Sequence, residues 1–215
     1  MNSRSTKKSA YQSRLRADQA AATRQMVLDA ATRLFVEQGY TATSIDAIAE
    51  AAGVSRSTVF AAAGGKSWLL KTAYDRAIAG DDEPVPVLER PEARKLFALS
   101  DPAEIVIGYA HIIAEAAERV SAICEAIHCA AGCDNEVADL WTEIGEQRLR
   151  GAETMAKLIR QKGGLRQGMT TARARDSIWI LNDPTLHHAL VRLRGWRQSH
   201  YREWLADNLQ SQLLG

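Results

Sequence analysis

The sequence has no apolar run of about 18 residues, so it predicts no membrane-spanning helix. Its first residues are basic and lack the apolar stretch of a secretory signal, which indicates a cytoplasmic protein. It holds three cysteines, an odd number that does not suit a framework of disulfide bonds. No segment alternates apolar and polar residues as a strand does. These absences favour a soluble, all-α protein.

Motifs of catalysis are also absent. The sequence has no Ser/His/Asp nucleophile pattern, no phosphate-binding loop and no His-Glu zinc motif. We therefore expect no enzymatic activity, no cofactor and no metal.

Charge, by contrast, is present and unevenly distributed. Residues 1–79 contain 11 Lys and Arg against 6 Asp and Glu, a net charge of +5. Residues 80–215 contain 16 against 20, a net charge of −4. A basic first part on an acidic remainder indicates an N-terminal region that faces nucleic acid, with chance clustering as the alternative.

Helical periodicity begins after a polar, basic segment. We interpret residues 1–22 as a flexible arm that can become helical toward its end and whose cations reach phosphates or the minor groove, with a solvated tail as the alternative. The basic residues of this arm and of the start of the next helix are Arg4, Lys7, Lys8, Arg14, Arg16 and Arg24. From Thr23, apolar residues recur at helical spacing, and Gly39 predicts a left-handed helix end.

Two short helices follow over residues 44–63. Thr43 and Asp46 have the spacing of a capping box, and Gly53 ends the first of these helices. Ser55 is suited to cap the second, which begins at Arg56. Such a pair is a helix-turn-helix, which lays the first turn of its second helix toward base edges in the major groove. The alternative is an ordinary helical hairpin.

The rest of the chain predicts a larger helical domain over residues 80–215. Its first segment, 80–91, is acidic, holds three prolines and indicates a boundary. Helices are expected near Pro91, over residues 102–130, 135–161, 171–181 and 184–193, and after Ser199. The predicted organisation is therefore an arm (1–22), a helix-turn-helix domain with a fourth helix at its end (23–79) and a helical body (80–215).

The run GYTATSIDAIAEAAGVSRSTVF and the following GGKSWLL resemble the DNA-binding domain of the tetracycline-repressor (TetR) family of bacterial transcription regulators. In that family a helix ending in Gly-Tyr leads to T-[ST]-x-x-x-I-A, an A-G-V-S turn, a recognition helix and a lysine that opens the fourth helix. By position, the resemblance implies DNA contacts from Ser44, Arg56, Ser57, Thr58, Phe60, Ala61, Ala62 and Lys66.

Two features depart from the family pattern. Phe60 stands where the family usually has a tyrosine that bonds a phosphate, and Ala61–Ala63 replace larger side chains. A lost bond to a charged group costs about 1.5–3 kcal/mol. Gly64 and Gly65, with Lys66 beside them, could replace it by a backbone phosphate site, and the alanine methyls could contact thymine. Alternatively, the alanines only pack.

The family's helical body binds an inducer and dimerises. Candidates for the ligand pocket are Tyr109, His111, Ile112, Cys124, His128, Trp141, Ile144, Arg148 and Trp179. The two histidines and the arginine would suit a polar or anionic ligand. Cys124 with His128, and Cys129 with Cys133, have a spacing that could bind zinc or sense oxidants, although spaced cysteines on an apolar helix are more often buried.

The last helix carries an apolar stripe, formed by Trp204, Leu205, Leu209 and Leu213, that we interpret as the seam of a homodimer, with packing on its own domain as the alternative. A two-fold dimer would read a palindromic operator in double-stranded DNA. The prediction is a repressor that a small molecule releases by moving the fourth helix through Trp68, Leu70 and Tyr74. The alternative is a small-molecule-binding protein or enzyme with a degenerate helix-turn-helix.

Overall fold

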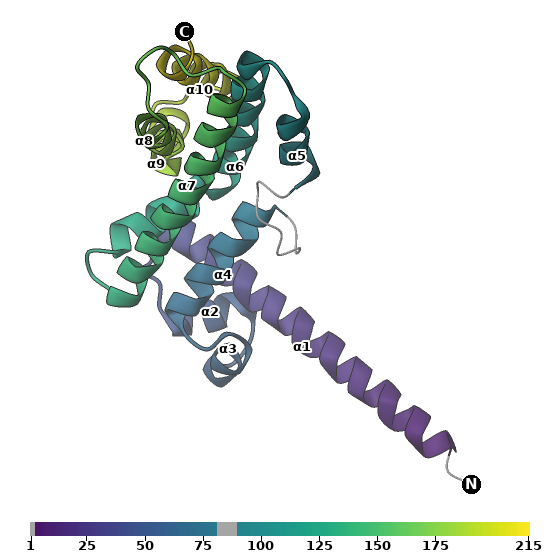
Figure 1. The fold of residues 1–215 in the computed structure, drawn as a ribbon. Helices are drawn as coiled ribbons and strands as arrows, with labels where there is room; N and C mark the ends of the chain where they lie inside the picture. The colour runs from purple at the N-terminus through teal and green to yellow at the C-terminus, as the bar shows by residue number, and fades with distance from the viewer. Residues whose placement is uncertain (1–2, 81–89) are drawn as a thin grey trace. The chain divides into compact units, whose positions relative to one another are not determined.

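The computed structural model describes residues 3–80 and 90–215, and this part of the chain contains helices and an isolated β-bridge but no strand (Figure 1). The predicted all-α class is confirmed. The chain divides into two compact units, Met1–Ala73 and Tyr74–Gly215, so the division falls inside a helix rather than at residue 80. The acidic segment expected as a boundary lies largely outside the described residues.

Unit 1 consists of α1 (Ser3–Gln38), α2 (Ile45–Ala52), α3 (Arg56–Ala63) and the first part of α4 (Lys66–Ala79). α2 and α3 pack against α1 and against each other. The buried side chains that join these helices are mostly apolar, and they include Val27, Ala31, Phe35, Ile48, Ala49, Val59, Leu69 and Leu70. Burial of this apolar surface is the main favourable term that holds the helices together.

α1 begins much earlier than the sequence indicates. Its first residue is Ser3, whereas periodicity placed the helix start at Thr23. Residues 3–22 contain no glycine or proline and many alanine, arginine, lysine and glutamine residues, all of which favour helix without an apolar face. A method based on apolar spacing therefore misses this part. The side chains of Arg4, Lys7 and Lys8 lie outside the described residues.

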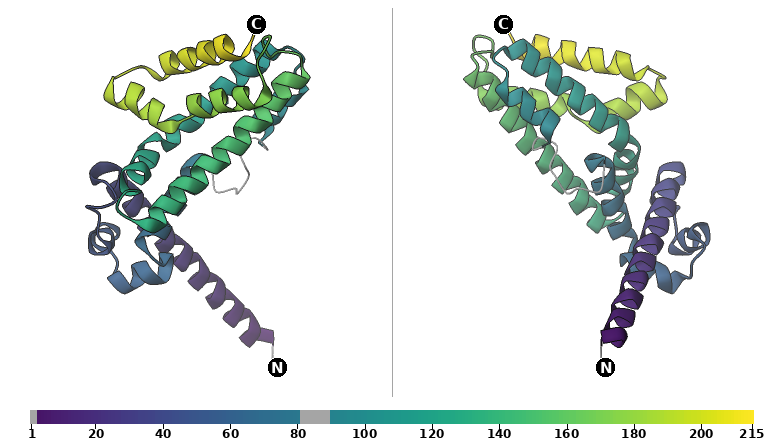
Figure 2. Two further views of the ribbon diagram at one scale, coloured as in Figure 1. Left: turned by 60° about the vertical axis from the view of Figure 1, so that its left-hand side comes forward. Right: turned by 90° about the vertical axis from the view of Figure 1, so that its right-hand side faces the viewer.

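Unit 2 contains the end of α4 and the remaining helices. These are α5 (Pro91–Ala98), α6 (Pro102–Ala130), α7 (Asn135–Gln161), α8 (Thr171–Leu181), α9 (Pro184–His187), the π-helix η2 (His188–Leu193) and α10 (Gln198–Leu213). α6 packs against both α7 and α10 (Figure 2). Within the described residues, no helix has the length and hydrophobicity needed to cross a membrane.

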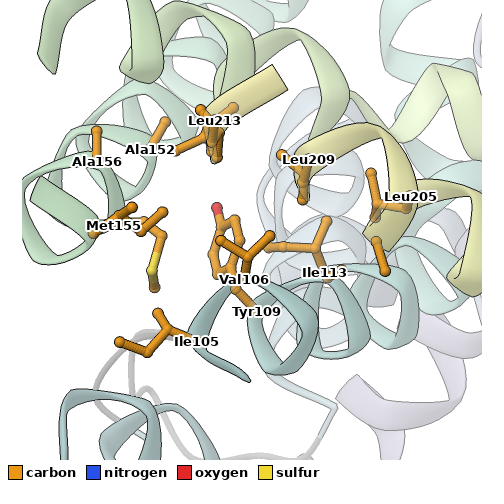
Figure 3. Close-up of a cluster of buried hydrophobic side chains, with 14 of the residues drawn as sticks. Ile105, Val106, Tyr109, Ile113, Ala152, Met155, Ala156, Leu205, Leu209 and Leu213 are labelled. Atoms are coloured by element: carbon orange, nitrogen blue, oxygen red, sulfur yellow. The ribbon is translucent and has the colours of Figure 1, made fainter. Parts of the chain in front are cut away.

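The core of unit 2 lies where α6, α7, α8 and α10 meet. In Figure 3, the Tyr109 ring extends from α6 toward Met155, Leu209 and Leu213, which come from α7 and α10. The helix expected over residues 184–193 is divided, because its second half changes to the wider π pattern. Arg194 N donates to Ala189 O at 3.1 Å, five residues back.

Candidate nucleic-acid interface and the interior of unit 2

Local capping sets the positions of α2 and α3. Ser44, not Thr43, caps α2, because its Oγ accepts from Ala47 N at 3.0 Å. Thr43 is buried, and its hydroxyl donates to Gly39 O at 2.8 Å, so the predicted capping box is wrong by one residue. Gly53 ends α2 with a φ of +67°, a conformation that glycine adopts without strain.

Ser55 caps α3 as predicted, with Thr58 N donating to its Oγ at 3.2 Å. The same oxygen lies 2.8 Å from the hydroxyls of both Ser57 and Thr58. The three hydroxyls therefore form one cluster at the start of α3. Hydroxyl groups can exchange such bonds for bonds to phosphate or base edges at little cost.

One side of α3 is buried and the other is exposed. Val59 and Ala63 pack into unit 1, whereas Arg56, Ser57, Phe60 and Ala61 are exposed. Thr58 and Ala62 are partly buried. The helix therefore presents to solvent the side chains that the resemblance implied for DNA contacts, and Ala63 serves in packing.

Two cations near α3 have protein partners. Arg24 of α1 donates from Nε to Ala62 O at 3.0 Å, which satisfies a carbonyl in the last turn of α3. Lys66 donates from Nζ to Tyr40 O at 2.9 Å, and its ammonium lies 3.9 Å from the centroid of the Tyr40 ring. The expected phosphate contact of Lys66 would therefore share the ammonium with this structural role.

Arg56 is the exposed cation of the first turn of α3. Its Nη1 donates to Asp46 Oδ2 at 2.7 Å, and its guanidinium carbon lies 5.7 Å from the centroid of the Phe60 ring. Sequence reasoning did not find this arrangement, because Asp46 lies ten residues earlier, on α2.

The ligand-pocket candidates lie in different surroundings. Tyr109, Cys124 and Ile144 are buried in unit 2, and Ile112, Trp141, Arg148 and Trp179 are partly buried. His111 and His128 are exposed, and the His128 ring stacks on Trp141 with 4.9 Å between centroids. The histidines therefore do not line the interior of unit 2, contrary to their proposed role there.

Arg148 is the strongest polar feature of this interior. Its guanidinium donates to Asn182 O at 3.2 Å and to Trp179 O at 2.8 Å, and Nη1 lies 3.0 Å from Asp183 Oδ2. The side chain is only 9% exposed. It thus joins α7 to the end of α8 and the cap of α9, and these bonds compete with the polar or anionic ligand that the sequence suggested.

Several neutral polar groups lie near Arg148. Burial raises the pKa of the Tyr74, Tyr109 and Tyr201 hydroxyls well above the usual range, and the positive charge of Arg148 opposes this rise. Asn182 Nδ2 donates to the Tyr109 hydroxyl at 3.4 Å. Among the described residues, the Tyr201 hydroxyl has no hydrogen-bond partner. At neutral pH these tyrosines are uncharged donors and acceptors.

The cysteines differ in exposure. Burial raises the pKa of the Cys124 thiol to about 12, so the reactive thiolate is suppressed at neutral pH. Cys124 is buried whereas His128, one turn later, is exposed, so the two do not share surroundings. Cys129 donates to Glu125 Oε1 at 3.3 Å, and Cys133 is exposed. Among the described residues no three His, Cys, Asp or Glu side chains gather at one point.

The apolar stripe of α10 is mostly internal. Leu205, Leu209 and Leu213 are buried in the core of unit 2, and Trp204 is partly buried against that core. A side chain that is buried in its own unit offers no surface to a second copy, so these leucines do not form the predicted seam. Exposed apolar side chains occur instead at Ile180 of α8 (56% exposed) and Leu193 of η2 (72% exposed).

A polar chain inside unit 2 was also missed by sequence reasoning. Gln198 donates to Ala114 O at 2.8 Å and accepts from His187 Nε2 at 2.8 Å. The other ring nitrogen, Nδ1, lies 2.9 Å from the Ser121 hydroxyl. These hydrogen bonds link α6, α9 and α10. No local motif predicts them, because the bonded residues are far apart in sequence.

These features define a helix-turn-helix protein with a second, all-helical unit. Residues 27–73 match the family model described as "Bacterial regulatory proteins, tetR family". The resemblance inferred from the sequence is therefore confirmed for residues 27–73. No curated protein is matched in sequence.

Solved structures share the fold over most of their length. NalD of Pseudomonas aeruginosa, the secondary repressor of the MexAB-OprM multidrug efflux pump, is 20% identical, with 92% of this chain and 98% of NalD covered and a TM-score of 0.67. A putative transcriptional regulator from Saccharomonospora viridis in complex with choline is 17% identical, with 91% and 99% covered and a TM-score of 0.69. The regulator FadR from Bacillus subtilis in complex with stearoyl-CoA is 17% identical, with 88% and 98% covered and a TM-score of 0.67.

Proposed function

We propose that this tetR-family regulator is a cytoplasmic homodimeric repressor that binds a palindromic operator through α3 and leaves it when unit 2 binds a small molecule. The observation that carries the proposal is the exposed side of α3. This side carries Arg56, the hydroxyl cluster and small side chains, and the opposite side of the helix is buried in unit 1. Side chains of this kind, in the first turn of such a helix, suit phosphate and base contacts.

The ligand part of the proposal rests on the interior of unit 2. Neutral hydroxyls and one thiol lie among apolar side chains there, which is the composition of many small-molecule sites. Tyr74 belongs to this interior and to α4, which runs without a break from unit 1 into unit 2. A ligand that displaces Tyr74 would therefore act on the helix that follows α3. Choline and stearoyl-CoA, bound by two structural neighbours, are the first probes to test.

The dimer part rests on exposed apolar side chains rather than on the α10 leucines. Ile180 and Leu193 are large, apolar and mostly exposed. Burial of such side chains against a second copy would be favourable. Ile180→Glu and Leu193→Glu should shift sedimentation from dimer to monomer, whereas the matched change Phe97→Glu on α5 should not. A wild-type chain that sediments as a monomer would contradict this part.

The DNA experiment selects duplexes from a random pool with the full-length wild-type protein, then measures binding at several salt concentrations. Selection of a palindrome, with affinity that falls steeply as salt rises, supports the proposal. Weak, equal binding to all duplexes would instead support the degenerate helix-turn-helix. Release is tested by adding ligands identified through quenching of the five tryptophans, and an operator affinity that no bound ligand changes would remove the release step.

A further inference from the structure

Arg56 is held from two directions in unit 1. Asp46, in the first turn of α2, accepts from Nη1 at 2.7 Å. Phe60, one turn further along α3, places its ring 5.7 Å from the guanidinium carbon. The carboxylate thus holds one edge of the guanidinium, and the guanidinium carbon lies over the aromatic ring.

This arrangement contributes little to folding. The Arg56 and Asp46 side chains are 59% and 67% exposed, and exposed ion pairs add almost nothing to stability because water screens them. Phe60 is 44% exposed, so its ring is only partly buried. Its main effect is on orientation, because an arginine side chain otherwise samples many rotamers.

An oriented arginine is what guanine recognition needs. Guanine presents two acceptors, O6 and N7, in the major groove, and arginine matches them with two parallel N–H groups. The guanidinium carries five N–H donors, and the bond to Asp46 uses a single one of them. With Asp46 on one edge, the guanidinium of Arg56 keeps two parallel N–H donors for a base. Adenine is disfavoured because it has an amino group in place of the O6 acceptor of guanine.

Resting on the proposed function, we infer that Asp46 and Phe60 are positioning residues that hold Arg56 to read a guanine in the operator. This explains the absence of a hydroxyl at residue 60. The ring serves as a stacking surface for Arg56, a role for which a phenylalanine is sufficient. The base preference of the protein then depends on a residue of α2 as well as on α3.

The experiment starts from the operator selected by the wild-type protein. The base position at which Arg56→Ala abolishes the preference for guanine is identified first. Fluorescence anisotropy then compares duplexes with guanine and with adenine at that position. Asp46→Asn keeps the shape of the side chain and removes its charge, and it should reduce the guanine preference about fivefold or more. Binding to an unrelated duplex should not weaken.

Two matched variants separate positioning from charge and from folding. Glu50→Gln removes a carboxylate from an exposed position of the same helix and should keep the wild-type preference. Phe60→Leu removes the ring and should lower the preference, whereas Phe60→Tyr keeps the ring and should retain it. Thermal unfolding of each variant shows whether unit 1 remains folded.

The outcomes are distinguishable. If Asp46→Asn tightens binding to all duplexes equally and leaves the ratio of guanine to adenine unchanged, Asp46 only repels DNA and the inference is wrong. The same holds if Phe60→Leu retains the full preference. If the wild-type protein selects no sequence at all, the proposed function fails and the inference fails with it.

Discussion

Unit 1 and unit 2 each contain an arginine paired with an aspartate and placed over an aromatic ring. In unit 1, Arg56 lies against Asp46 and Phe60. In unit 2, Arg148 lies 3.0 Å from Asp183, with its guanidinium carbon 5.3 Å from the Trp179 ring centroid. The Arg56 side chain is 59% exposed and the Arg148 side chain 9%.

Burial gives the two similar clusters opposite roles. Arg148 also donates to two backbone carbonyls, so its charge and donors are used inside the protein. Arg56 makes one hydrogen bond, to a carboxylate that water can replace. The buried cluster holds helices together, and the exposed cluster is available to a partner. Removal of each arginine should therefore affect different measurements.

The largest expected effect is on stability in unit 2. Arg148→Met should lower the free energy of unfolding by about 3 kcal/mol or more, because Asp183 Oδ2 loses its charged partner and two backbone carbonyls lose the guanidinium donor. Arg56→Met, the matched change, should alter it by less than about 1 kcal/mol. Urea denaturation followed by circular dichroism measures both. Equal small effects would remove the contrast between the two clusters.

The next effect is on DNA binding in unit 1. Arg56→Ala should weaken operator binding by about 1–3 kcal/mol and relax base preference, with little change in stability. Lys66→Ala should weaken binding to all duplexes alike and reduce the salt slope by about one. It should also lower the unfolding temperature, because Lys66 bonds Tyr40 O in the folded chain. If Lys66→Ala relaxed the base preference and Arg56→Ala did not, these roles would be wrong.

The helices and the helix-turn-helix could be predicted from sequence because their signals are local. Ser55, Gly53 and Gly39 mark helix ends within a few residues, and the structure has each of them in that role. The sequence placed the cap of α2 at Thr43 rather than at Ser44, because Thr43 and Asp46 have the three-residue spacing of a capping box. Adjacent hydroxyl residues cannot be separated by spacing alone.

The clusters around the two arginines could not be predicted, because their partners are distant in sequence. Arg148 bonds residues more than thirty positions away, and no pattern in α7 marks it as buried. The leucine stripe of α10 illustrates a different limit. An apolar helix face predicts that the face is buried, but it does not tell whether the partner is the core of the same unit or a second protomer, because both accept the same apolar side chains.

A smaller effect concerns pH and the buried histidine of unit 2. Burial lowers the pKa of His187 below its usual value near 6.5, and the bond to Gln198 only partly offsets this. The unfolded chain therefore binds a proton that the folded chain does not, so stability should fall as pH decreases below about 6.5. The slope cannot exceed about 1.4 kcal/mol per pH unit for one proton.

Urea denaturation of the wild-type protein at several pH values measures this slope. His187→Gln should flatten it, whereas His111→Gln, a change at an exposed histidine, should leave it as in the wild type. A slope that His187→Gln does not change would assign the pH dependence to other groups.

The smallest expected effect compares two buried tyrosines of unit 2. The Tyr109 hydroxyl accepts from Asn182, whereas that of Tyr201 has no partner among the described residues. Tyr109→Phe should therefore cost about 0.5–1.5 kcal/mol of unfolding free energy, because the partly buried amide of Asn182 loses its acceptor. Tyr201→Phe removes an unpaired polar atom from the interior and should be neutral or slightly stabilising. If Tyr201→Phe were the more costly change, the hydroxyl must have a partner in the folded protein, and the interior would be more fully paired than its contacts indicate.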